Sequence, residues 1–103
     1  MIRCSGCGRG MGREGDPGPV ASISGGILGD EVTDSYFLCR ECDAYTVEVV
    51  RDRFLGGEET SLRGPLSRAE GDERVALIRA CTEPWDKRCR CPAHRAYFGG
   101  GLD

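Results

Sequence analysis

Residues 39–51 read CRECDAYTVEVVR, a Cys-x-x-Cys pair that runs directly into the clearest strand of the chain. From Tyr45 to Arg51, aromatic and β-branched residues alternate with polar ones, and this alternation is typical of a strand with one buried face. Tyrosine, valine and threonine are also residue types that strands favour. The stretch therefore predicts a cysteine turn from which a half-buried strand emerges.

A matching pair, Cys4-Ser5-Gly6-Cys7, lies near the start of the sequence and is followed by Gly8. Two residues between cysteines allow a tight turn to aim both sulfurs at one point, and a glycine after the second cysteine permits left-handed backbone. Neither pair opens a helix in a βαβ context, which argues against a thioredoxin-type redox motif. Two such turns supply four thiolates, so we predict a first metal site made of Cys4, Cys7, Cys39 and Cys42.

At these two pairs the chain resembles the zinc-ribbon and rubredoxin-like class, over residues 1–55. The resemblance implies two cysteine knuckles on hairpin turns that clamp one metal between short antiparallel strands. Rubredoxins tend to have Pro and Gly in the later knuckle where this chain has Arg40 and Asp43, and the chain lacks their dense aromatic core. These departures favour structural zinc, with iron in the same four sulfurs as the alternative.

The remaining three cysteines and the only histidine form the pattern Cys-x7-Cys-x-Cys-x2-His. Three cysteines and one histidine are a known structural zinc set, so we predict a second site made of Cys81, Cys89, Cys91 and His94. The two sites together use every cysteine and the histidine. The alternative is that Cys81 packs as a small hydrophobic residue on a helix, which leaves three ligands and an open position of the kind found in catalytic zinc sites.

The pattern of the whole sequence predicts a small metal-stabilised α+β fold, in which a zinc-ribbon-like antiparallel β part precedes a helix and a Cys/His metal-binding segment. We expect a first helix over 68–81, with either a capping box from Ser67 to Glu70 or Asp72 as the N-cap, and a second helix over about 92–98, after a first-turn proline. The other expected elements are one hairpin arm, or a strand broken by a bulge at Gly25-Gly26, over 20–28, an acidic loop over 30–34 and a short strand over 36–38. The predicted organisation is a zinc-ribbon-like part at 1–55, a linker at 56–66, the helix and metal knuckle at 67–98, and a flexible tail at 99–103.

Composition indicates that a cross-link supports the fold. Hydrophobic residues make up 39% of the chain, and 16 glycines add backbone entropy that folding must overcome. The chain begins Met1-Ile2-Arg3-Cys4 without an apolar signal segment, and no run approaches the roughly 18 apolar residues of a membrane span. We therefore expect a cytoplasmic protein, in which reduced cysteines bind metal rather than form disulfides.

The charge and the motifs restrict the classes of function that the sequence allows. A net charge of −3 and a pI near 5.2 argue against general binding to nucleic acid or to an anionic membrane. We find no phosphate-binding loop, no Ser-His arrangement and no carboxylate pair in an acid–base setting. We therefore expect a non-enzymatic protein-interaction module or accessory subunit with two zinc ions and a protein partner. The alternatives are an iron-based electron-transfer protein, rubredoxin-like or with an iron–sulfur cluster, and a metal chaperone or sensor with an exchangeable second site.

Overall fold

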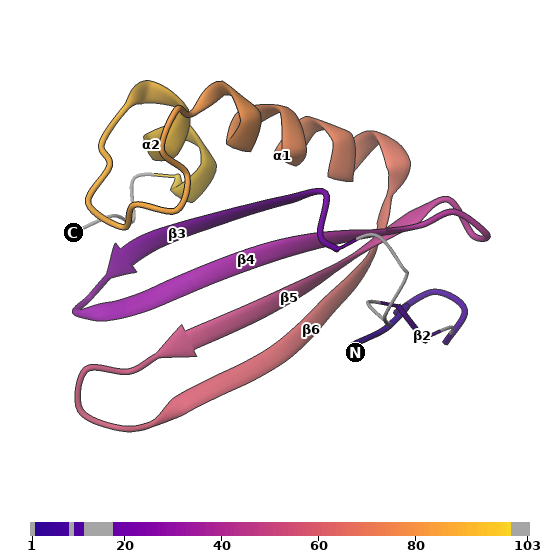
Figure 1. The fold of residues 1–103 in the computed structure, drawn as a ribbon, viewed down its shortest axis with the longest axis horizontal. Coiled ribbons are helices and arrows are strands. Elements are labelled where there is room, and N and C mark those ends of the chain that lie inside the picture. The colour runs from indigo at the N-terminus through magenta and orange to yellow at the C-terminus, as the bar shows by residue number, and fades with distance from the viewer. Residues whose placement is uncertain (1, 9, 12–17, 100–103) are drawn as a thin grey trace.

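A four-stranded antiparallel sheet carries two helices in the computed structural model, which describes residues 2–8, 10–11 and 18–99 (Figure 1). The sheet order follows the chain, β3-β4-β5-β6, so each strand pairs with the next one. A separate two-stranded hairpin, β1–β2, lies at the N-terminal end. The elements are β1 (Ile2–Arg3), β2 (Gly10–Met11), β3 (Ala21–Ile27), β4 (Asp30–Cys39), β5 (Ala44–Asp52), β6 (Glu58–Ser67), α1 (Arg68–Ala80) and α2 (Pro92–Phe98).

Strands β4, β5 and β6 are longer than the sequence pattern predicted. The expected acidic loop at 30–34 forms the first half of β4, and most of the expected linker at 56–66 forms β6. Both predictions were wrong for the same reason: polar side chains are compatible with a strand wherever one of its faces meets water. β6 is an edge strand and is exposed along almost its whole length, where Pro65 is also tolerated. Of the two alternatives for residues 20–28, the single hairpin arm is confirmed and the bulge is not, because β3 pairs with β4 without interruption through Gly25-Gly26.

Both predicted helices are confirmed, and of the two starts considered for the first helix, the structure has Ser67 rather than Asp72. Ser67 is the N-cap of α1, and its side chain accepts a hydrogen bond from the Glu70 N–H at 3.1 Å. α2 begins at Pro92, and Gly99 ends it in the left-handed conformation that helix C-termini favour. The expected tail residues after Gly99 lie outside the described part of the chain. Neither of these helices is long and apolar enough to span a membrane.

Both helices pack on one face of the sheet, and the apolar core lies between them and the strands. The core contains three tyrosines, whose hydroxyl groups all find partners. Tyr36 and Tyr97 meet at 2.6 Å between their hydroxyl oxygens, and the Tyr45 hydroxyl donates to Asp72 Oδ1 at 2.6 Å. Buried tyrosines thus add hydrogen bonds to hydrophobic burial. The buried core residues are Ile23, Val32, Tyr36, Tyr45, Val47, Val49, Val75, Ile78 and Tyr97.

Candidate metal centres

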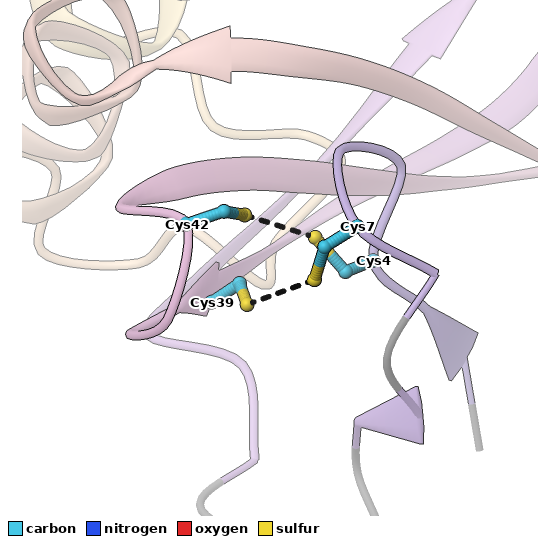
Figure 2. A group of neighbouring side chains, drawn as sticks. All are labelled: Cys4, Cys7, Cys39 and Cys42. Carbon is cyan, nitrogen blue, oxygen red and sulfur yellow. Dashed lines mark hydrogen bonds between the residues drawn. The ribbon is translucent and has the colours of Figure 1, made fainter.

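The four ligands of each predicted metal site are called a quartet below. The first quartet comes together where hairpin β1–β2 meets the turn between β4 and β5. Cys4 and Cys7 lie in the turn of the first hairpin, while Cys39 ends β4 and Cys42 lies in the turn that follows (Figure 2). Cys4 Sγ is 3.3 Å from Cys42 Sγ, Cys7 Sγ is 3.7 Å from Cys39 Sγ, and all four sulfurs lie within 4.8 Å of one another. Thiolates bound tetrahedrally at about 2.3 Å from one ion are about 3.8 Å apart. The four sulfurs therefore have the spacing of ligands around a single ion.

Backbone geometry explains how the two knuckles turn. In the first, the Gly6 N–H donates to Cys4 Sγ at 3.3 Å, and Gly8 has a φ of 78°, as the sequence predicted. In the second, the corresponding left-handed residue is Asp43, with a φ of 53°. Aspartate is among the few non-glycine residues that tolerate this region. Its carboxylate also accepts from Arg68 Nη1 at 2.7 Å, which fixes this turn to the start of α1.

The first knuckle is fastened to the sheet by a threonine that the sequence pattern placed on an outward face. Thr46 is fully buried, because the knuckle covers it. The Ser5 N–H donates to Thr46 Oγ1 at 2.8 Å, and the two hydroxyl oxygens are 2.9 Å apart. Alternation along β5 puts Thr46 on the face opposite Tyr45 and Val47, but no sequence signal showed that Ser5 would cover it. Thr46 is therefore a supporting residue that sequence reasoning missed.

The first quartet holds one negative charge easily and a second one poorly. Burial alone would raise the pKa of Cys4, but hydrogen bonds from the backbone of Cys7 and Gly6 and from the Cys42 thiol outweigh it and lower the pKa to about 6. The same hydrogen bond to Cys4, together with burial, raises the pKa of Cys42 to about 12. A second thiolate beside the first is thus unfavourable for the protein alone. A divalent cation among the sulfurs would remove that repulsion.

The second predicted quartet comes together between the two helices. Cys81 caps the C-terminus of α1, Cys89 and Cys91 lie in the loop, and His94 lies in the first turn of α2. Cys81 Sγ is 3.6 Å from Cys89 Sγ and 3.4 Å from His94 Nδ1, and all four donor atoms lie within 4.8 Å of one another. Sulfur and nitrogen ligands of one tetrahedral zinc ion are about 3.6 Å apart. The structure thus brings Cys81 into the same group as the other three residues.

Hydrogen bonding prepares His94 to offer one particular nitrogen. His94 is fully buried, and its Nε2 lies 2.6 Å from the Ser24 carbonyl oxygen on β3. A carbonyl oxygen only accepts, so Nε2 carries the hydrogen and Nδ1 keeps its lone pair toward the sulfurs. Ser24 is itself held from the other side, because its N–H donates to the Pro84 carbonyl at 2.8 Å. These contacts attach the second quartet to the edge of the sheet.

The thiols of the second quartet also differ in acidity. Burial raises the pKa of Cys81 to about 11. The backbone N–H of His94, which donates to Cys91 Sγ at 3.3 Å, lowers the pKa of Cys91. Cys91 is also the N-cap of α2, so one sulfur both begins the helix and belongs to the quartet. As in the first quartet, one thiol has a lowered pKa and another a raised one, but here the thiol with the raised pKa is the buried one.

No family model, curated protein or solved structure matches this chain. The class of the protein therefore follows from its own residues. It is a small α+β protein with a four-stranded antiparallel sheet, two helices and two Cys/His groups that could each hold a metal ion.

Proposed function

We propose that the chain is a two-site zinc protein in which each quartet binds one ion as a closed structural site, and that the folded surface binds a protein partner. The observation that carries the metal proposal is the presence of two separate groups of four sulfur or nitrogen donors, each within 4.8 Å. Such donor sets suit zinc, and four protein ligands leave no open position for catalysis. The two hairpin knuckles of the first quartet support its zinc-ribbon-like interpretation. Cytoplasmic conditions would keep these thiols reduced.

Elemental analysis tests the metal proposal directly. Protein purified under reducing conditions is expected to be colourless and to carry about two zinc ions per chain, one for each quartet. Visible absorption with bound iron would instead support the electron-transfer alternative. A content of one ion per chain, or none, would contradict the two-site proposal.

Chelation tests which of the two ions is removed first and how much the ions stabilise the fold. Cys7 and Cys42 are exposed, whereas no member of the second quartet is, so a chelator is expected to remove the first ion sooner. This accessibility favours the first site, rather than the second, as the exchangeable one. Removal of both ions is expected to unfold the chain, since structural zinc contributes on the order of 10 kcal/mol or more to small zinc domains. Retention of the native near-ultraviolet circular dichroism in the ion-free protein would contradict a structural role.

An exposed apolar patch supports the proposed protein partner. Leu28 in the β3–β4 turn is 85% exposed, and Phe54 and Leu55 in the β5–β6 turn are 77% and 91% exposed. A hydrogen bond of 3.1 Å from the Phe54 N–H to Asp30 Oδ1 ties the two turns together. Contiguous exposed apolar side chains often mark interaction sites. This turn patch lies at the opposite end of the sheet from the first quartet (Figure 1).

Serine substitutions in the turn patch test whether this patch binds the protein partner. The double variant Phe54→Ser and Leu55→Ser is expected to lose most co-purifying partner while keeping two zinc ions, because both side chains are exposed and contribute little to stability. Leu62→Ser, a partly exposed leucine on β6, is the matched control and is expected to bind as the wild type does. Equal recovery of the partner by the double variant and the control would contradict the assignment of the patch.

A further inference from the structure

A groove of about 520 Å³ lies on the helix side of the sheet, and none of its lining residues belongs to either quartet. Its volume is within the range of small-molecule sites. One end of α2 forms a wall through Tyr97 and Phe98, and strands β4, β5 and β6 form the floor. The register aligns the floor residues in three cross-strand rows, which are Tyr36–Val47–Arg63, Asp34–Val49–Ser61 and Val32–Arg51–Glu59.

The arginines of this groove are unequally paired. Arg51 Nε lies 2.7 Å from Asp30 Oδ2, and Arg53 Nη2 lies 2.8 Å from Glu59 Oε2, so two of the four cations are neutralised by neighbours. The other two lining arginines are Arg63 and Arg74, and the only lining carboxylate left to them is Asp34.

The pairing therefore leaves the groove with one positive charge in excess, in a chain whose net charge is negative. The Arg63 side chain makes no ion pair or hydrogen bond with the described residues. Its charge lowers the pKa of Asp34 only through space. The groove thus carries one positive charge that no neighbouring carboxylate neutralises.

A chain of hydrogen bonds occupies one oxygen of the Asp34 carboxylate beside these cations. The Tyr97 hydroxyl donates to Asp34 Oδ2 at 2.6 Å, so Tyr36 must give its own hydrogen to Tyr97. Arg74 is held in place, since its Nη1 donates to the Tyr97 carbonyl at 3.2 Å and its guanidinium lies 5.2 Å from the ring centroid. Arg74 keeps further N–H groups, and Arg63 keeps all of its own. The groove consequently offers the N–H groups of two arginines to a ligand.

The rest of the lining is apolar. Ile27, Leu66 and Phe98 are partly exposed beside the buried valines of the floor. We propose that this groove binds a small organic carboxylate, whose apolar body lies on these side chains and whose carboxylate accepts N–H groups from Arg63 and Arg74. One carboxylate supplies the missing charge, and guanidinium groups match its planar geometry. This ligand site is separate from the proposed zinc sites and from the turn patch.

Nuclear magnetic resonance titration of the metal-loaded protein tests the site, with 4-phenylbutyrate as the probe and 4-phenylbutan-1-ol as its neutral analogue. The carboxylate is expected to bind with a dissociation constant on the order of 1 mM, as suits a fragment of this size. The shifts are expected to be saturable and to concentrate on the amides of Val49, Ser61 and Tyr97. The alcohol is expected to bind at least tenfold more weakly.

Arginine variants locate the anionic contact. Arg63→Gln is expected to weaken 4-phenylbutyrate binding about tenfold or more, because it removes charge-assisted hydrogen bonds. Arg79→Gln is the matched control, since Arg79 is an exposed cation of α1 outside the groove, and its affinity is expected to stay within about twofold. The proposal is overturned if no saturable shifts appear in the groove, if the alcohol binds equally well, or if Arg63→Gln has no effect. Shifts along β6 that depend on protein concentration without the probe would assign the groove to a second copy of the chain, which also overturns it.

Discussion

Replacing Cys81 by Ser is expected to reduce the bound metal from two ions per chain to one and to release α2 from the sheet. The Cys81 sulfur is buried and lies 3.4 Å from His94 Nδ1, within ligand distance of a shared ion. A serine hydroxyl is a much poorer zinc ligand than a thiolate at neutral pH. Substitution of outer-shell partners already costs about 10–100-fold in metal affinity, so loss of a direct ligand is expected to cost more. Elemental analysis and equilibrium unfolding measure the two effects.

The control for this variant separates metal binding from packing. Ile78→Val removes one methylene from the buried helix face next to Cys81 and is expected to cost about 0.5–1.5 kcal/mol while both ions stay bound. Two ions bound with wild-type affinity in Cys81→Ser would show that Cys81 only packs. The second site would then have three ligands and an open position, and its proposed structural role would fail.

Replacing Gly71 by Ala is expected to destabilise the protein, although alanine is the better helix former by about 1 kcal/mol. A Cβ at position 71 would lie 1.9 Å from Tyr45 Cδ2, well inside any allowed contact. The ring cannot move aside easily, because Tyr45 is buried and its hydroxyl is bonded to Asp72. Overpacking of this kind costs about 1–3 kcal/mol. We expect a net loss in that range when unfolding by urea is measured on the metal-loaded protein.

Two further variants identify the cause of that loss. Glu73→Ala, at an exposed position of the same helix, is expected to change the free energy of unfolding by less than about 0.5 kcal/mol. Combining Gly71→Ala with Tyr45→Leu is expected to cost less than the two single changes together, because a smaller side chain makes room for the methyl group. If Gly71→Ala were as stable as the wild type, close packing of α1 on the Tyr45 ring would be refuted.

Features governed by short-range chemistry were predictable from the sequence. The spacing of the cysteines and His94 indicated both quartets, and the structure brings the same eight residues together. Ser67 and Pro92 marked the starts of the two helices because a cap and a first-turn proline act on the adjacent turn. The alternation after Cys42 likewise indicated β5. Each of these signals acts over a few residues, so the identities of residues close together in the sequence were sufficient to predict these features.

The polar strands were harder to predict because their pairing partners lie elsewhere in the chain. The 30–34 segment is acidic and β6 carries glycine, proline and charged residues, so local propensity opposed both strands. β4 forms because it is paired on both sides, and β6 forms because β5 offers it a free edge. Glycine is a poor helix former, whereas the missing side chain of Gly71 is what allows α1 to contact Tyr45.

The sequence by itself determined which residues form the two quartets, where the second helix begins and which strand leads away from the second knuckle. Only the tertiary structure decided what supports and surrounds them: Thr46 beneath the first knuckle, the Ser24 carbonyl that orients His94, and the groove beside Asp34. The physical reason is the range of the interactions. Caps and cysteine turns act between residues a few positions apart, whereas a backbone carbonyl or a cross-strand row acquires its partner only when distant segments pack together.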